Sequence, residues 1–247
     1  MTWLGSFGRA LVIAPHPDDE ILGVGGTIAR LTKAGHEVFV AVVTTGRPPD
    51  YSAAETARVR AEAARAHALL GVADIFWLNL PAARLAETSH AVQNEALGKI
   101  VKQVEPATLF VPFAGDIHMD HQLTFLSAMV AARPHQAAYP GTILAYETLS
   151  ETNWNAPYLA PTFAPNVFVD ITDTLAVKLE AMAMYESQVR CFPHERSTEA
   201  LKALATLRGA TVHRPAAEAF VLVRNVVFSD QTQREVHREY LATTYSR

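Results

Sequence analysis

Apolar and polar positions alternate in blocks along the first half of the chain, in a pattern typical of strands followed by helices. Residues 10–14 form an unbroken apolar run, as expected of a strand that is buried on both faces of a sheet. Three further short apolar runs predict strands at residues 36–45, 74–80 and 107–113. The longer amphipathic segments between and after them predict helices at residues 21–34, 52–70, 88–104 and 118–132.

This alternation, with short links, predicts an α/β fold in which helices cover a mostly parallel sheet, because parallel strands need crossover connections. Right-handed crossovers then give a Rossmann-like three-layer sandwich. The second half is less regular, with strands predicted at 143–146, 167–170 and 219–228 and helices at 173–189 and 197–208. Residues 147–165 show no period and predict a long loop bordering a functional site. No linker composition divides the chain, so we expect a single domain over residues 1–247.

Composition limits the classes of protein that the chain can belong to. The chain has 247 residues, 49% of them hydrophobic, which is enough for a large core, and a net charge of −4. Its basic residues are scattered, which argues against a nucleic-acid partner. Its apolar runs are too short to cross a bilayer, so we expect no membrane partner. Cys191 is the only cysteine, which excludes an internal disulfide and a cysteine-rich zinc site and fits a cytoplasmic location.

The first candidate for chemistry is the polar run Pro15-His16-Pro17-Asp18-Asp19-Glu20, which directly follows the strand predicted at 10–14. His16 and Asp19 lie three residues apart on a strand-to-helix turn, which can aim both side chains at one point. An imidazole and a carboxylate suit Zn²⁺, and also Fe²⁺ or Mn²⁺. Asp18 between them is placed to act as a general base on water. The alternative is a capping turn, with Asp18 or Asp19 as the N-cap of the next helix.

The second candidate is Gly115-Asp116-Ile117-His118-Met119-Asp120-His121, which follows the strand predicted at 107–113. His118 and His121 lie three residues apart at a helix start, and either can complete a His-Asp-His ligand set. The alternative is a pair of surface histidines. Both motifs follow strands of one parallel sheet, where α/β proteins keep their ligand sites, so together they favour one metal centre open to a substrate.

These two motifs, Pro15 to Glu20 and His118-Met119-Asp120-His121, resemble those of the PIG-L/LmbE family of zinc-dependent N-deacetylases. Proteins of that family have a Rossmann-like fold and remove acetyl groups from N-acetylglucosaminyl compounds. Other stretches match its general pattern: residues 23–27, 185–188 and 217–220. The resemblance implies that the chain is a hydrolase acting on a small amino-sugar substrate. It also implies a homo-oligomer, with a hexamer as one form.

The resemblance also assigns roles to individual residues. It implies that Zn²⁺ is held by His16, Asp19 and His121. Asp18 matches the general base of the family. His118 matches the histidine that polarises the amide carbonyl or protonates the leaving amine, and Asp120 would hold His118 in the required tautomer.

Substrate contacts are less specified by the sequence. The resemblance places a sugar-binding arginine near the start of the helix at 52–70, where Arg60 is the first choice and Arg58 the alternative. Arg47 stands where many family members carry an acid, which indicates a negative group on the substrate, an ion pair in the free site or a solvated loop residue. Tyr185 and His194 are further candidates for hydrogen bonds to the substrate. Their alternatives are a place in the helix core and a capped helix start.

Two other functions remain open at this stage. A few relatives of the family act as hydratases on unsaturated acids, although the intact HPDDE motif disfavours that reading here. A sugar-binding module without catalysis is disfavoured because Asp18 and His118 are retained. Trp154, Tyr158 and Phe163 in the long loop suit either stacking on a sugar ring or a subunit interface.

Overall fold

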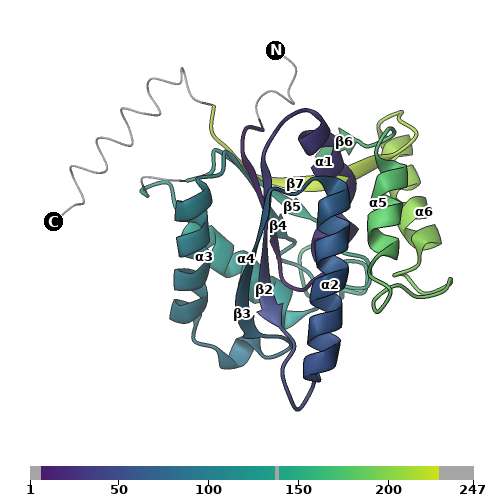
Figure 1. Cartoon of the computed structure of the whole chain (residues 1–247). Helices are drawn as coiled ribbons and strands as arrows, with labels where there is room; N and C mark the ends of the chain where they lie inside the picture. Colours follow the sequence, from purple (N-terminus) through teal and green to yellow (C-terminus); the bar gives the residue numbers. More distant parts are fainter. Residues whose placement is uncertain (1–6, 137–138, 228–247) are drawn as a thin grey trace.

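The computed structural model describes residues 7–136 and 139–227, whose centre is a sheet of seven strands (Figure 1). The strand order is β3-β2-β1-β4-β5-β7-β6. The strands are β1 (Ala10–Ala14), β2 (Val38–Thr45), β3 (Asp74–Pro81), β4 (Thr108–Pro112), β5 (Thr142–Tyr146), β6 (Val167–Asp170) and β7 (Ala217–Asn225).

Neighbouring strands from β3 through β5 pair in parallel, whereas β7 runs antiparallel to both β5 and β6. The predicted α/β fold with a mostly parallel, Rossmann-like sheet is therefore confirmed. From β1 the chain moves outward to β2 and β3, and then returns to the other side of β1 to form β4. The order of connection thus reverses between β1 and β4, which is where α/β proteins open a crevice for ligands.

Helices cover both faces of the sheet and make the outer layers of the sandwich (Figure 1). Helices α1, α2, α5 and α6 pack on one face, and α3 and α4 pack on the other. Their bounds, with the 3₁₀ turn η2, are α1 (Asp19–Lys33), α2 (Ala53–Leu70), η2 (Leu85–Glu87), α3 (His90–Val104), α4 (Met119–Ala131), α5 (Leu175–Ala183) and α6 (Thr198–Thr211).

Local sequence explains where these elements begin and end. All five residues of β1 are fully buried between the two helical layers, which is why this run contains no polar side chain. Helix α2 begins with a capping box, in which Ser52 and Glu55 satisfy each other's backbone amides. It ends at Leu70, and the next residue, Gly71, has a φ of 73°. Glycine adopts this left-handed conformation without a steric penalty because it has no Cβ.

Most element bounds lie within a few residues of those predicted, but the helix predicted at 173–189 is wrong at its end. Helix α5 stops at Ala183, and the next segment turns away to make tertiary hydrogen bonds. The Ser187 amide donates to the Glu62 carboxylate at 3.1 Å, so contacts with α2 override the helical propensity of this segment. Strand β7 ends at Asn225, so the strand predicted at 219–228 is too long at its end, and residue 228 lies outside the described residues. In the described part of the chain, no helix is long and apolar enough to cross a membrane.

Candidate active site

The first half of the site is the turn between β1 and α1. Asp18 occupies the N-cap position of α1, as the capping alternative predicts, but its side chain makes no capping hydrogen bond. Its φ of 114° lies in the left-handed region, which residues other than glycine seldom adopt. Such a conformation costs about 1–3 kcal/mol and persists only where the surroundings hold it. The backbone conformation that places the Asp18 side chain is therefore locally destabilising.

The second half of the site is the turn between β4 and α4, beside the first because β1 and β4 are paired neighbours. His118 is the N-cap of α4, and its Nδ1 accepts the Asp120 amide proton at 3.1 Å. The neutral imidazole of His118 therefore carries its proton on Nε2. His121, one turn further on, is fully buried, so the interpretation of both histidines as surface residues is wrong for His121.

Three candidate metal ligands from the two motifs meet at this point. Donor atoms of His16, Asp19 and His121 all lie within 4.8 Å of one another. Asp19 Oδ2 lies 3.3 Å from His16 Nδ1 and 3.2 Å from His121 Nε2. Within the part of the chain that the structure describes, Asp19 Oδ1 and His121 Nε2 are buried without a hydrogen-bond partner, a costly arrangement for polar atoms. A cation that takes lone pairs from both atoms would remove that cost, so the residues fit a divalent metal ion.

Each of the two histidines, His16 and His121, contacts a second carboxylate through the ring nitrogen that does not face Asp19. Asp120 Oδ2 lies 3.1 Å from His16 Nε2, and Asp116 Oδ2 lies 2.9 Å from His121 Nδ1. Each contact leaves the other ring nitrogen facing Asp19, and metal-binding histidines are commonly oriented in this way. The sequence alone indicates no role for Asp116. Its position in the motif was visible there, but not its contact with His121.

The expected role of Asp120 needs correction. Its carboxylate contacts His16 rather than His118, and only its backbone amide reaches His118. The same carboxylate accepts the amides of Ala83, at 2.7 Å, and Leu85, at 3.1 Å. A second possible ligand set contains His16, His118 and Asp120. Because the Asp120 oxygens already accept these hydrogen bonds, the set built on Asp19 is the better metal site.

The electrostatics of the cluster fit a site for positive charge. Burial would raise the pKa of Asp19, but His121 and His16 hold it well below its ordinary value. Burial also disfavours charge on His16, yet hydrogen bonds to Asp120 and Asp19 raise its pKa to about 9. For His121, burial is outweighed by Asp19 and Asp116, and the pKa rises to about 10. The buried carboxylates are thus balanced by imidazole protons, which a bound cation would displace.

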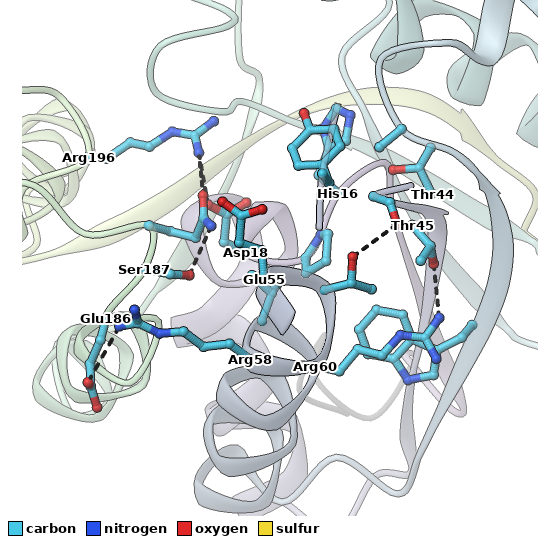
Figure 2. Close-up of a pocket in the computed structure, with 18 of the residues that line it drawn as sticks. His16, Asp18, Thr44, Thr45, Glu55, Arg58, Arg60, Glu186, Ser187 and Arg196 are labelled. Carbon is cyan, nitrogen blue, oxygen red and sulfur yellow. Dashed lines mark hydrogen bonds and ion pairs between the residues drawn. The ribbon is translucent and has the colours of Figure 1, made fainter. Parts of the chain in front are cut away.

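Asp18 lies beside this cluster and is only 1% exposed. Arg196 donates to its carboxylate at 3.1 Å, and Figure 2 shows the two side chains pointing toward each other. Burial raises the pKa of Asp18 to about 7, against the opposing charge of Arg196. Burial and the nearby His16 and His121 lower the pKa of His118 to about 4, so this ring is neutral at pH 7.

The cluster borders a cavity of about 630 Å³ that is lined by both motifs, by α2 and by the segment after α5 (Figure 2). Arg60 lines the cavity, and its guanidinium carbon lies 4.6 Å from the centre of the Trp77 ring. The same guanidinium donates to the Thr45 hydroxyl at 3.0 Å. Arg58, the alternative choice, also lines the cavity and pairs with Glu62 at 2.9 Å. Both arginines are therefore available to a ligand in the cavity.

Three predicted substrate contacts do not line the cavity. Arg47 is exposed, and its hydrogen bond to the Asn79 carbonyl holds its side chain against β3. Tyr185 is fully buried and donates to Glu20 at 2.6 Å, behind the turn that carries Asp18. His194 is exposed, and its ring accepts the amide of Arg196. Arg196, two residues beyond His194, lines the cavity together with Arg190, and no sequence signal distinguished it.

The long loop at 147–165 borders the site, as predicted. Glu151 lines the cavity and lies 3.6 Å from Arg196, and Thr152 donates to Asp116 at 2.6 Å. The aromatic residues of the loop are placed differently. Tyr158 is 97% exposed and does not line the cavity. Phe163 packs edge-on against Phe113, with the two ring centres 5.1 Å apart.

Comparison with known proteins defines the class first. The chain is 32% identical over 197 residues to the diacetylchitobiose deacetylase of Thermococcus kodakarensis, covering 76% of this chain and 71% of the relative. A solved N,N'-diacetylchitobiose deacetylase from Pyrococcus horikoshii, bound to its inhibitor MPG, superposes with a TM-score of 0.70. That match has 26% identity and covers 90% of this chain and 88% of the other. This protein is therefore a deacetylase, a hydrolase that acts on amide bonds.

The particular family follows from the sequence match. Residues 11–132 match the PIG-L family, described as GlcNAc-PI de-N-acetylase. The chain belongs to the PIG-L family, and the resemblance seen in its two motifs is confirmed. A 4-carboxy-2-hydroxymuconate hydratase from Pseudomonas putida KT2440 also superposes, with a TM-score of 0.71, over 90% of this chain and 99% of that chain. Its identity is 20%, so that likeness shows a shared fold alone.

Proposed function

We propose that this protein is a zinc-dependent deacetylase that removes the N-acetyl group from an N-acetylglucosamine-type amino sugar or its conjugate. The observation that carries this proposal is the His16–Asp19–His121 cluster beside Asp18 and the cavity, in which Asp19 Oδ1 and His121 Nε2 are buried with no partner among the described residues. Relatives that act on diacetylchitobiose support the substrate class.

The metal would be held by His16, Asp19 and His121. This donor set, two imidazoles and one carboxylate, suits Zn²⁺ and also Fe²⁺ or Mn²⁺, and it leaves room for a substrate. When bound, the ion would supply a Lewis acid that polarises the acetyl carbonyl and makes water more acidic. Asp116 and Asp120 would keep the two rings in orientation from behind.

Asp18 and His118 have different roles in the proposed reaction. The Asp18 carboxylate accepts a proton from the attacking water, and its contact with Arg196 favours the ionised form that a base needs. The proton can then pass from Asp18 to the leaving amine, because an amide nitrogen leaves only when it is protonated. His118 faces the cavity with Nε2–H free to donate to the acetyl oxygen, since Nδ1 already accepts the Asp120 amide.

Acetate release tests this proposal. The purified protein, with its metal content measured, would be incubated with N-acetylglucosamine, diacetylchitobiose, N-acetylglucosaminyl-inositol and N-acetylglucosaminyl-malate. We expect release of one acetate per amine formed from at least one compound. A protein with stoichiometric zinc that releases no acetate from any of them would contradict the proposal. Hydration of an unsaturated acid in the same preparation would instead favour the hydratase reading.

The proposed homo-oligomer, with a hexamer as one form, and the single domain over residues 1–247 stay predictions. Light scattering of the zinc-loaded protein measures the number of chains in the assembly. Limited proteolysis of the same sample measures whether the chain divides into separate units.

A further inference from the structure

The carboxylate of Glu20 is fully buried and is shared by three separate segments of the chain. Its Oε2 accepts the backbone amide of Asp18 at 3.1 Å. Its Oε1 accepts the Tyr185 hydroxyl at 2.6 Å and lies 2.8 Å from His67 Nε2. Because an ionised carboxylate only accepts, His67 donates to it from Nε2, and His67 Nδ1 has no hydrogen-bond partner among the described residues. Glu20 therefore links the start of α1 to α2 and to the segment after α5.

The amide that Glu20 accepts belongs to the residue with the strained backbone. Asp18 has a φ of 114°, which a non-glycine residue adopts only when its surroundings compensate. The Asp18 carbonyl is held separately, by the amides of Ile21 and Leu22 at 3.0 and 2.9 Å. Glu20 thus holds the amide side of the same residue, and without it this buried donor would lack an acceptor.

The neighbouring metal ligand is held by other contacts. The His16 amide donates to Asp19 Oδ2 at 2.8 Å, and the same oxygen lies 3.2 Å from His121 Nε2. Neither contact involves Glu20. A change at Glu20 should therefore affect the placement of Asp18 more than the placement of Asp19.

We propose that Glu20 is a positioning residue for the general base. Its carboxylate, held by Tyr185 and His67, keeps the Asp18 backbone in the left-handed conformation that presents the Asp18 side chain to the cavity and to Arg196. This inference rests on the proposed function only in taking Asp18 as the base. It also explains why Tyr185 is buried rather than exposed to a substrate.

The test is Glu20→Gln, which keeps the shape but replaces one acceptor oxygen with an NH₂ group. That group must face either the Asp18 amide, which then loses its acceptor, or Tyr185 and His67, which must then accept rather than donate, with His67 changing its tautomer. We expect kcat to fall about 100-fold, as misplacement of a reacting group by about 1 Å does, with KM and zinc per chain unchanged. Tyr185→Phe, which removes only a hydroxyl, should lower kcat in the same direction by less.

Glu218→Gln is the matched control. Glu218 is also buried against α1, where it accepts the amides of Gly26 at 2.8 Å and Thr27 at 2.7 Å, but it does not touch Asp18. This variant should lose thermal stability while keeping kcat per folded molecule. The difference between the two Gln variants separates the positioning of Asp18 from a general loss of stability.

A crystal structure of the zinc-loaded Glu20→Gln protein gives a readout that does not need activity. We expect Asp18 to leave the left-handed region and to lose its contact with Arg196, while His16, Asp19 and His121 stay in place. The inference is overturned if Asp18 keeps both features, if kcat is unchanged, or if zinc is lost in step with kcat. Absence of acetate release from the unaltered protein would contradict the proposed function instead, and the crystal structure would still decide this point. If Glu20→Gln does not fold, Tyr185→Phe provides both readouts.

Discussion

Arg196 donates to the carboxylate of Asp18 at 3.1 Å, across 178 positions of sequence. The arginine comes from the loop before α6, and the aspartate comes from the turn after β1. A buried carboxylate beside a guanidinium is held toward its ionised form, which opposes the effect of burial. The pairing therefore connects the loop at 190–197 to the proposed base, and it leads to the first prediction.

Replacing Arg196 should shift the pH dependence of the reaction. In Arg196→Gln the cation that lowers the pKa of Asp18 is gone, so that pKa rises. Because the base works only when ionised, the acidic limb of the kcat/KM profile should move to higher pH. Arg190→Gln is the control, since Arg190 lines the same cavity but donates to the Ser187 and Val189 carbonyls. An acidic limb that stays in place in Arg196→Gln would contradict the prediction.

Asp18→Asn should keep the metal and lose turnover. The amide has nearly the same shape but cannot accept a proton at neutral pH, and general bases typically contribute about 10²–10⁴-fold to rate. Acetate release and zinc content would be measured on the same sample. Asp50→Asn, at an exposed ion pair with Arg84, serves as a surface control. Retained activity in Asp18→Asn would mean that another residue is the base.

His121→Ala should lose the metal, since it removes one of the three proposed ligands. The zinc content of the purified variant should fall well below that of the unaltered protein. The melting temperature should then no longer rise when zinc is added, because a ligand stabilises only the state that binds it. Treatment of the unaltered protein with a chelator should reproduce both effects. Unchanged zinc content in His121→Ala would refute its role as a ligand.

Asp116→Asn should weaken metal binding without abolishing it. Asp116 accepts from His121 Nδ1 at 2.9 Å and from Thr152 at 2.6 Å, so it orients a ligand without being one. Loss of such a supporting carboxylate typically costs about 10–100-fold in metal affinity. Competition with a zinc-binding dye would measure the change. An affinity equal to that of the unaltered protein would show that His121 is oriented by other contacts.

Gly23→Ala and Gly98→Ala should change stability in opposite directions, although both glycines lie inside helices. A Cβ at Gly23 would come within 2.2 Å of the Tyr146 ring, so the core must shift, at a cost of about 1–3 kcal/mol. A Cβ at Gly98 meets no described residue within 4 Å, so alanine should stabilise α3 by roughly 0.5–1 kcal/mol. Urea unfolding of the two variants measures both effects, and an equal change in the two would contradict this account.

Much of the fold could be predicted because its signals are local. The apolar run of β1 and the capping residues of α2 are each specified by a few adjacent residues. The end of α5 could not be predicted, because Ser187 leaves the helix to donate to Glu62, a residue 125 positions away. The hydrogen bonds of Tyr185 to Glu20 and of Arg47 to Asn79 could not be predicted for the same reason, since contacts with distant residues decide which way each side chain points.

By itself, the sequence determined the order of strands and helices, the family and the two motifs whose donor atoms meet in the site. These depend on periodicity and on short patterns, which neighbouring residues specify together. Only the tertiary structure decided that β1 and β4 are neighbours, which brings His16 and Asp19 to His121. It alone revealed Arg196 and Asp116 as partners of the site. Such contacts join residues far apart in sequence, and they exist only once the sheet has ordered its strands.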